Sequence, residues 1–390
     1  MNPNRSQLAG LYIHIPFCAE KCLYCDFYSI TDLTNTGPFL AALEREMGMA
    51  GRTTLTFDTL YIGGGTPSVL GAAAIEHIIA AAFIHFDIRP EAEVTVEVNP
   101  ATVSLEDFRR YHQSGVNRLN IGIQSFQEEN LLFLGRIHSR EEALSSIDWA
   151  RQAGFDNIGL DLIYGLPEQD ESCWLYDLDQ AVQFNPEHLS CYILTRESGT
   201  PLDRELMAGR IRLPTDENLR KLFKTTVDHL TNHGYLHYEV SNFARQAEYD
   251  SEPWVSRHNS KYWSHAPYIG LGPSAHSYPE PERHWNHHSI EKYLQDIRHG
   301  KLPIAEKEKL TREQIIMEAI YLGFRTTHGI DLADFERRFE IDFSKTFRET
   351  IEEYKRNKLL KVTKTHCALT TKGMVMLDSI TAEFTSQDWP

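Results

Sequence analysis

The sequence has no long hydrophobic run. No stretch of its 390 residues approaches the roughly 18 consecutive apolar residues that a membrane-spanning helix needs. The N-terminal segment, MNPNRSQLAG, is polar and lacks the apolar region of a secretory signal peptide. Both absences favour a cytoplasmic protein, and an apolar content of 41% is enough for a large buried core.

Positive charge is also scarce. The chain has 39 Lys and Arg residues against 55 Asp and Glu residues, which gives a formal charge of −16. Neutralising phosphates requires a basic surface, so we expect no nucleic acid partner. One basic run, from 355 to 372, contains no acidic residue. We interpret it as a solvated face or a lid over a site, in preference to a DNA-binding surface.

Cysteines are few, and three of the six are scattered at Cys173, Cys191 and Cys367. This is not the pattern of a disulfide scaffold, and a reducing compartment disfavours disulfides in any case. The other three cysteines lie together in the segment HIPFCAEKCLYCDF, His14 to Phe27. Their clustering indicates metal or redox chemistry.

The clustered cysteines Cys18, Cys22 and Cys25 have the spacing C-x3-C-x2-C. Three thiolates can hold three irons of a cubane cluster and leave the fourth iron open to a ligand. A structural zinc site is the competing interpretation, but it needs four ligands. His14 is a candidate fourth ligand, although we expect it to point away from the loop. Three unpaired structural thiols are the remaining alternative.

The first 200 residues alternate strand-like and helix-like segments. Six strands are expected, at 11–15, 59–65, 93–100, 117–126, 157–167 and 188–195. Such repetition predicts a parallel α/β sheet with right-handed crossovers. Six units can close partway into a barrel, and a doubly wound open sheet is the alternative.

The pattern changes after Thr200. An amphipathic helix over Asp216–His233 is followed by an aromatic- and histidine-rich region, Tyr235 to His288. From Thr311, three helices and a pair of short strands predict a small winged-helix-like α+β module. We therefore divide the chain into a core at 1–235, a connecting region at 236–305 and a C-terminal domain at 306–390.

Polar and glycine residues follow the predicted strands at their carboxyl ends. They are the cysteine loop, Gly63-Gly64-Gly65-Thr66-Pro67, Glu97, Asn99, Gln124, Asp161 and Thr195. Parallel α/β folds place their sites at this edge of the sheet, which favours the partial barrel. Glycines let a backbone approach a ligand, and the carboxylates can accept hydrogen bonds from an amine or from ribose hydroxyls. Arg136 can pair with a ligand carboxylate.

The cysteine spacing, the aromatic before the last cysteine and the GGGTP segment together resemble the radical S-adenosylmethionine superfamily. Further motifs resemble its oxygen-independent coproporphyrinogen III oxidase family. These are YIHIPFC at Tyr12–Cys18, GGGTPS at Gly63–Ser68, EVNP at Glu97–Pro100, GIQSF at Gly122–Phe126, LGRIH at Leu134–His138, DLIYGLP at Asp161–Pro167 and HNSKYW at His258–Trp263. With the C-terminal module, the resemblance covers nearly the whole chain.

The resemblance implies a partial (β/α)6 radical SAM barrel in which Cys18, Cys22 and Cys25 bind a [4Fe–4S] cluster. S-adenosylmethionine would chelate the open iron, and reduction would cleave it to a 5′-deoxyadenosyl radical. The positions implied for cofactor binding are Tyr12, Tyr24, Phe27, Gly64, Gly65, Thr66, Glu97, Gln124, Arg136, Asp161 and Thr195.

Two departures resemble the haem-chaperone (HemW-type) branch of this family, and the HNSKYW segment at His258–Trp263 resembles the same branch. The oxidases carry a fourth cysteine two positions after the third, where this chain has Phe27. They also carry a long N-terminal extension, whereas eleven residues precede Tyr12 here. The resemblance therefore implies a haem-binding chaperone that lacks oxidase activity. It also implies respiratory proteins, met at the membrane surface, as the acceptors of the haem. The alternative is radical oxidative decarboxylation of coproporphyrinogen III.

His258 is the candidate axial haem ligand. Histidine is a common iron ligand, and Tyr262 and Trp263 beside it could pack on a porphyrin. The alternative is a hydrogen-bonded structural histidine. His265, His276, His284, His287 and His288 add to the histidine density of this region, and we name no second ligand among them. An exposed edge of the core sheet would allow a homodimer.

Overall fold

The computed structural model describes residues 8–246 and 252–385. Its main element is a curved sheet in which six parallel strands follow one another in chain order, β1 next to β2 and so on to β6. The strands are β1 Ala9–Ile15, β2 Thr56–Gly64, β3 Asp87–Val98, β4 Arg118–Gln124, β5 Ile158–Tyr164 and β6 His188–Ile193. In a doubly wound sheet the order of the strands reverses near the centre, whereas here it does not reverse. The partial barrel is therefore confirmed.

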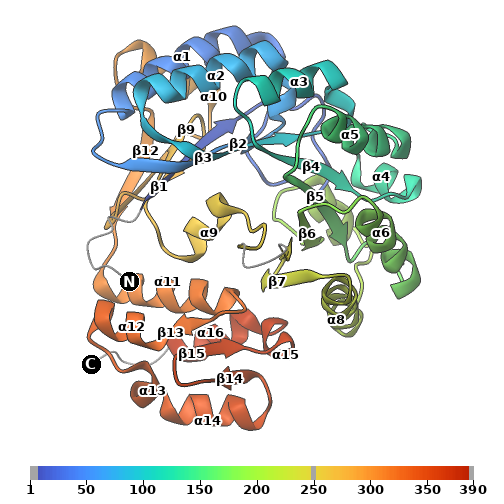
Figure 1. Ribbon diagram of the computed structural model, residues 1–390, viewed down its shortest axis with the longest axis vertical. Coiled ribbons are helices and arrows are strands. Elements are labelled where there is room, and N and C mark those ends of the chain that lie inside the picture. The colour runs from blue at the N-terminus through green and yellow to red at the C-terminus, as the bar shows by residue number, and fades with distance from the viewer. Residues whose placement is uncertain (1–7, 247–251, 386–390) are drawn as a thin grey trace.

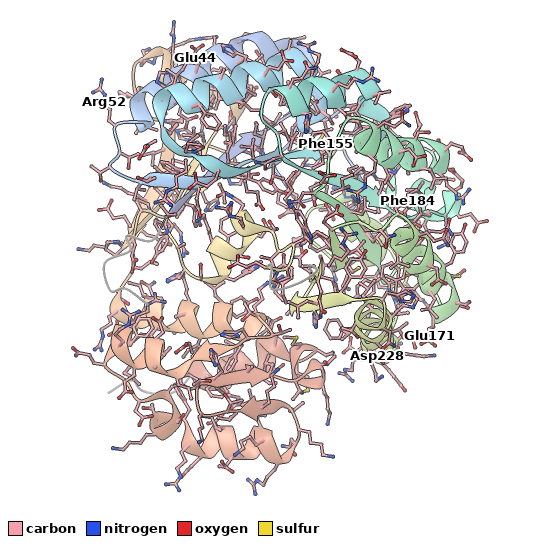
Figure 2. All side chains as sticks on the ribbon, in the orientation of Figure 1. Glu44, Arg52, Phe155, Glu171, Phe184 and Asp228 are labelled. Atoms are coloured by element: carbon pink, nitrogen blue, oxygen red, sulfur yellow. The ribbon has the colours of Figure 1, made fainter. Side chains whose placement is uncertain are left out.

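Helices cover the convex face of this sheet (Figure 1). They are α1 Thr36–Ala50, α2 Ala72–His85, α3 Leu105–Gln113, α4 Glu128–Leu134, α5 Arg140–Gln152, α6 Glu171–Gln183, α7 Pro201–Met207 and α8 Asp216–Asn232, with short 3-10 turns at Leu33–Asn35, Pro67–Leu70 and Pro100–Thr102. Ser104 caps α3 in a capping box with Asp107, as its position before the helix predicts. Figure 2 shows Glu44, Glu171 and Asp228 on the outside of these helices.

The strands have one apolar and one polar face. On β3, Val94, Val96 and Val98 are buried in the hydrophobic core, and Glu93 and Glu97 alternate with them. Because side chains alternate along a strand, the glutamates point to the opposite, concave face. The interior of the partial barrel is therefore polar, while the core lies between the sheet and the helices.

Both edges of the six-stranded unit are extended by later parts of the chain. Strand β9 (Tyr268–Leu271) pairs parallel with β1, and β8 (Asn242–Arg245) pairs antiparallel with β6 and with β7 (Tyr235–Glu239). Beyond β7, the Val240 N–H donates to the carbonyl of Arg325. Beyond β9, Tyr268 forms a bridge with Tyr278. Each edge is therefore contacted from within the same chain.

The remainder of the connecting region forms a helix in the concavity and a small sheet. Helix α9 (Arg257–Trp263) lies inside the curve of the main sheet (Figure 1). Strands β10 (His276–Ser277), β11 (Glu282–Asn286) and β12 (Ile304–Lys309) form an antiparallel sheet, and α10 (Ile290–Arg298) packs near α1. The region thus extends both edges of the partial barrel and places a helix in its concavity. The domain boundaries at 235 and 305 remain a prediction.

The C-terminal part has the predicted order of helices followed by a hairpin. Its elements are α11 Arg312–Arg325, β13 Ile330–Asp331, α12 Leu332–Phe339, α13 Phe343–Thr346, α14 Arg348–Arg356, β14 Leu360–Val362, β15 His366–Leu369, α15 Thr371–Met374 and α16 Leu377–Thr385. Strands β14 and β15 pair antiparallel, and β13 adds a third strand. Across the described ranges, no helix has the length and apolar character to cross a membrane.

Candidate cofactor site

The cysteine loop follows β1 and returns to it. The Cys18 N–H donates to the carbonyl of Ile30 at 3.0 Å, and the Ile30 N–H donates to the carbonyl of Pro16 at 2.8 Å. These two bonds close the loop at its base, so the segment between them is presented at the carboxyl edge of the sheet. Cys18 is buried, Cys22 and Cys25 are half-buried, and all three are free thiols.

The glycine triplet at the end of β2 packs directly against this loop. The Gly65 and Thr66 N–H groups donate to the carbonyls of Ile15 and Phe17 at 2.8 and 2.7 Å. A Cβ on Gly65 would lie 2.6 Å from the Phe17 carbonyl oxygen and 3.1 Å from Cys18 Sγ. Only glycine therefore fits at this position, next to a cysteine sulfur. The Thr66 hydroxyl also donates to Cys18 Sγ at 3.4 Å.

Arg136 links the second cysteine to β4. Its Nη1 donates to Cys22 Sγ at 3.4 Å and its Nη2 donates to the Gly122 carbonyl at 2.9 Å. Its Nε is buried and has no partner among the described residues. Tyr24 lies close enough to interact with both Cys22 and Arg136. The guanidinium therefore retains hydrogen-bonding capacity beside the cysteine loop.

The three thiols are close enough to influence one another. Burial raises the pKa of Cys25, and the charges of Cys22 and Cys18 act in the same direction. Three neighbouring thiolates are unstable without a cation to neutralise them, and iron supplies that charge. Along 8–246 and 252–385, no three His, Cys, Asp or Glu side chains converge on a single ion. In a cubane cluster, by contrast, each thiolate binds a different iron.

Two half-buried carboxylates lie further along the same edge. Glu97 accepts from the Tyr61 hydroxyl at 2.7 Å and from the Gly64 N–H at 3.1 Å, and burial raises its pKa to about 7. Asp161 accepts from Asn120 Nδ2 at 2.6 Å, and burial raises its pKa. The second oxygen of Asp161, Oδ1, is buried without a partner in the described part of the chain. It can accept a hydrogen bond from a ligand.

The remaining predicted positions differ in their surroundings. Gln124 adopts a positive φ of 68°. Its side-chain amide nitrogen would lie 2.9 Å from a Cβ placed on Gly122, so this side chain covers Gly122, whose carbonyl accepts from Arg136. The Tyr12 hydroxyl lies 3.1 Å from His14 Nδ1. Thr195 donates to Glu197 within its own exposed loop, and Phe27 is 66% exposed. These last two residues lie outside the buried group.

Both ring nitrogens of His14 have hydrogen-bond partners at the cysteine loop and on β1. Its Nε2 donates to the carbonyl of Tyr28 at 2.8 Å, which leaves Nδ1 to accept from the Tyr12 hydroxyl at 3.1 Å. Burial lowers the His14 pKa to about 4. The ring supports the loop from beneath, in line with the expectation that it is not a fourth ligand.

His258 occupies a closed seat in the concavity. Its Nδ1 lies 2.8 Å from Thr59 Oγ1 and its Nε2 lies 3.0 Å from the Tyr262 hydroxyl. Its ring stacks on Tyr61 with centroids 5.1 Å apart, and only 1% of the residue is exposed. Burial lowers its pKa to about 3. This arrangement favours the structural alternative, because neither nitrogen can reach an iron without leaving its partner.

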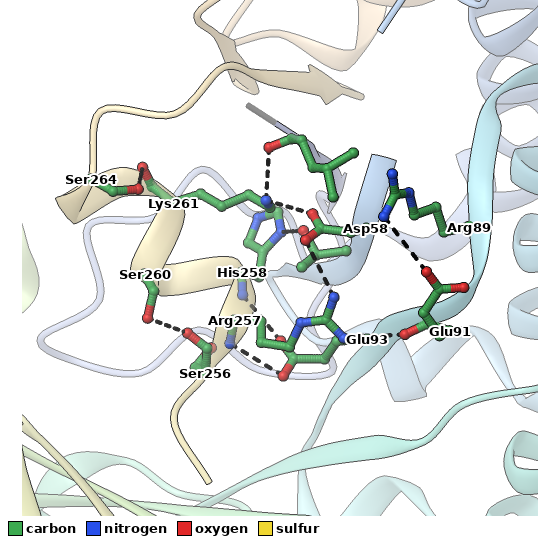
Figure 3. A network of polar contacts seen from close by, with 12 residues as sticks. Asp58, Arg89, Glu91, Glu93, Ser256, Arg257, His258, Ser260, Lys261 and Ser264 are labelled. Carbon is green, nitrogen blue, oxygen red and sulfur yellow. Dashed lines mark hydrogen bonds and ion pairs between the residues drawn. The ribbon is translucent and has the colours of Figure 1, made fainter. Parts of the chain in front are cut away.

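Charged contacts fasten α9 to the sheet around His258 (Figure 3). The backbone N–H groups of Arg257 and His258 donate to the Glu93 carboxylate at 3.2 and 3.0 Å. Lys261 and Arg257 form ion pairs with Asp58 at 2.5 and 3.2 Å. We name the group of Thr59, Glu93, His258 and Tyr262 the α9 seat.

Sequence reasoning missed several residues of the polar interior. Tyr61 donates a hydrogen bond to Glu97, and Asn120 donates one to Asp161. Arg118 is 1% exposed, and its positive charge lowers the pKa of both carboxylates, against the effect of burial. A signal was present, because these residues occupy every second position of otherwise apolar strands.

Known proteins match this chain along its whole length. Residues 12–181 match the radical SAM superfamily, and residues 310–376 match the HemN C-terminal domain. A protein of Lactococcus lactis called heme chaperone HemW is 32% identical over 378 residues, which is 97% of each chain. The chain belongs to the HemW family of radical SAM proteins.

Two further comparisons place this HemW-family chain. The Escherichia coli K12 heme chaperone HemW is 40% identical over 276 residues, covering 68% of this chain and 69% of the relative. The solved structure of coproporphyrinogen III oxidase (HemN) from Escherichia coli superposes with a TM-score of 0.82 at 24% identity, covering 97% of this chain and 90% of that one. This second likeness establishes the radical SAM fold. The resemblance inferred from the motifs is confirmed.

Proposed function

We propose that this protein is a haem chaperone that binds haem, carries a [4Fe–4S] cluster with S-adenosylmethionine, and delivers haem to respiratory proteins. The observation that carries the proposal is the end-to-end similarity to proteins called heme chaperone HemW. The residue two positions after Cys25 agrees with this branch, because it is the exposed Phe27 and offers no fourth thiolate. The protein would act from the cytoplasm and meet its acceptors at the membrane surface.

Cys18, Cys22 and Cys25 would hold the cluster. Their fit is supported by three free thiols on one closed loop and by Gly65, where an added Cβ would lie only 3.1 Å from Cys18 Sγ. Arg136 donates to Cys22, and hydrogen bonds to cluster sulfurs help to set the potential of such clusters.

S-adenosylmethionine would bind next to the cysteines. Arg136 Nε and Asp161 Oδ1 are buried atoms that have no partner within residues 8–246 and 252–385, and a ligand can supply one. Glu97 is held by two hydrogen bonds and faces the same interior. The other residues proposed to line this site are Tyr12, Tyr24, Gly64, Gly65, Thr66 and Gln124, with Phe27 and Thr195 at its outer limit. When bound, the two cofactors supply one-electron radical chemistry, while the chain orients the ligand and excludes water.

An anaerobic assay of the reconstituted full-length protein tests this proposal. Haem and coproporphyrinogen III are added to separate samples, and absorption spectra, deoxyadenosine and protoporphyrinogen are recorded. Stoichiometric haem binding without porphyrinogen turnover, followed by haem transfer to an apo-cytochrome, is the expected result. Release of carbon dioxide with formation of protoporphyrinogen would show the oxidase instead. Size measurement of the haem-loaded protein tests the expected homodimer.

A further inference from the structure

Gly159 lies on the concave face of β5, two residues before Asp161. Its neighbours Ile158 and Leu160 are buried in the hydrophobic core, so the alternation of side chains along the strand places Gly159 and Asp161 on the same, opposite face. Gly159 does not belong to the glycines with a positive φ, so the backbone of this strand does not itself require glycine. The requirement comes from the side chains that lie over it.

Asn120 and Arg118 of β4 fill the space over Gly159. Asn120 is the residue directly opposite Gly159 in the β4–β5 pair. A Cβ on Gly159 would lie 2.6 Å from Asn120 Oδ1 and 3.1 Å from Arg118 Nη2. The first of these distances is too short for a carbon and an oxygen that are not bonded, so any side chain at this position would displace the Asn120 amide. Glycine is needed here for a close approach of neighbouring groups.

The Asn120 amide connects this space to Asp161. Its nitrogen Nδ2 donates to Asp161 Oδ2 at 2.6 Å, while its oxygen Oδ1 lies over Gly159 on the side of Arg118. An amide has one donor end and one acceptor end, whereas a guanidinium has donors only and a carboxylate accepts. Arg118 therefore favours the amide orientation in which Nδ2 faces the carboxylate. The reversed amide would set donor against donor and acceptor against acceptor.

Arg118 is enclosed in the barrel and incompletely hydrogen-bonded. It is 1% exposed, and its Nε and Nη1 are buried with no hydrogen-bond partner along 8–246 and 252–385. Such a guanidinium costs stability, so a role in the fold alone does not account for it. Burial raises the pKa values of Asp161 and Glu97, and the charge of Arg118 opposes that rise. Arg118 thus acts on the two carboxylates of the cofactor site from the layer beneath them.

Asp161 is the member of this group that faces the ligand. Its Oδ2 accepts from Asn120, and its Oδ1 is buried with no partner in the described part of the chain. Its neighbour on β4 is Gly122, which has no side chain to hold the carboxylate, and its neighbour on β6 is Ser190, which is close enough to bond it. The short bond from Asn120 therefore restricts the rotation of the carboxylate and leaves Oδ1 available.

We propose that Gly159, Asn120 and Arg118 are positioning residues of the S-adenosylmethionine site. Gly159 leaves the space that the Asn120 amide fills, and Arg118 orients that amide. Asn120 in turn holds Asp161 with Oδ1 free for the ligand. The three residues act through Asp161 and do not contact the ligand themselves. This inference deepens the proposed function and rests on it, because it requires that S-adenosylmethionine binds beside Asp161.

The first test is a double-mutant cycle on S-adenosylmethionine affinity, measured by isothermal titration of the full-length, cluster-bearing protein. Gly159→Ala and Asn120→Ala are each expected to weaken binding about fivefold. The double variant should bind no more weakly than Asn120→Ala alone, because Gly159→Ala acts by displacing the Asn120 amide. Gly48→Ala on α1, where a Cβ would make an ordinary contact of 3.5 Å with His85, is the matched control and should keep its affinity.

The second test compares affinity with stability at Arg118. Arg118→Met removes an incompletely bonded buried charge, so the cofactor-free variant should keep or gain unfolding free energy in urea while its affinity for S-adenosylmethionine falls. Arg118→Lys retains a charged donor and should lose less affinity than Arg118→Met. A residue that only supports the fold would lose stability and keep affinity, and this result in Arg118→Met would overturn its assignment.

The outcomes separate the inference from the function on which it rests. If the wild-type chain binds no S-adenosylmethionine, the proposed function fails and the inference fails with it. If the wild-type chain binds it and a folded Asn120→Ala variant, judged by circular dichroism, keeps wild-type affinity, the function stands and the inference is wrong. Additive losses of affinity in the double variant would show that Gly159 does not act through Asn120, and they would also overturn the inference.

Discussion

The α9 seat and the carboxyl edge near the cysteine loop are two polar regions on the same concave side of the sheet, and they differ in how completely their groups are satisfied. In the seat, both ring nitrogens of His258 and both oxygens of Glu93 have partners. Around the cysteine loop, Asp161 Oδ1 and Arg136 Nε are buried and have no hydrogen-bond partner in the described part of the chain. A satisfied group stabilises the fold, whereas an unsatisfied buried group costs stability unless a ligand completes it.

The largest expected effect comes from removing a cysteine of the loop. Cys22→Ser should abolish the cluster, because a serine hydroxyl stays protonated and is a poor ligand for iron at neutral pH. Iron content and the visible absorption of the anaerobically reconstituted protein measure this. Cys173→Ser, a half-buried thiol outside the loop, is the control and should retain full iron content. Equal loss in both variants would contradict the site.

Substitution of the seat histidine should act on stability. His258→Ala leaves Thr59 and Tyr262 without their partner and opens a space against Tyr61, so we expect a loss of about 3 kcal/mol in the free energy of unfolding. Urea denaturation measures it. His258→Gln, which can restore one hydrogen bond, should recover part of this loss. A folded His258→Ala variant with wild-type stability would show that the seat does not stabilise the fold.

The pKa of Glu97 predicts a pH dependence of stability in the cofactor-free protein. Burial raises this pKa to about 7 from an ordinary 4.5, so the folded state holds a proton that the unfolded state releases. The resulting stabilisation is complete below pH 4.5 and is lost as the pH rises through 7. We expect at most about 3.5 kcal/mol of change, at about 1.4 kcal/mol per pKa unit.

The control for this pH dependence is Glu97→Gln, which keeps the shape and removes the titration. The difference in unfolding free energy between wild type and Glu97→Gln should fall between pH 5 and pH 8. A difference that is flat over this range would contradict the assignment of a raised pKa to Glu97.

Asp161 should contribute to ligand affinity more than to stability. Asp161→Asn keeps the shape but changes the acceptor character of the unpartnered position, so we expect binding of S-adenosylmethionine to weaken about tenfold, which is about 1.4 kcal/mol. Isothermal titration of the cluster-bearing protein measures it. Unchanged affinity would show that Oδ1 faces no ligand.

Thr195 should give the smallest effect. Its hydroxyl bonds Glu197 in an exposed loop, so Thr195→Val is expected to change S-adenosylmethionine affinity by less than about threefold, well under 1 kcal/mol. The same titration measures it. A loss of S-adenosylmethionine affinity as large as that of Asp161→Asn would show that the site extends to this loop.

Sequence reasoning reached the parts of the site that local signals encode. The cysteine spacing, the glycine triplet and the acidic residues at strand ends each depend on a few neighbouring residues, and parallel strands bring their carboxyl ends together. His258 contacts Thr59, which is 199 residues away in the sequence, and Glu93, which is 165 residues away. No local sequence pattern predicts contacts over such separations. Likewise β9, β8 and β7 extend the barrel from a region predicted only to connect.

The histidines show the same limit. Their density was visible in the sequence, but burial decides which of them can bind a ligand. His265 and His276 differ in this respect because tertiary packing encloses the first and leaves the second at a sheet edge. Periodicity within short strands such as β10 could not separate them.

The most direct test of this contrast is a paired measurement of unfolding free energy and of S-adenosylmethionine affinity for His258→Gln and Asp161→Asn, recorded side by side with the wild-type chain. We expect His258→Gln to lose stability and keep its affinity, and Asp161→Asn to lose affinity and keep its stability. Weaker binding in His258→Gln together with wild-type binding in Asp161→Asn would contradict the contrast between the two regions.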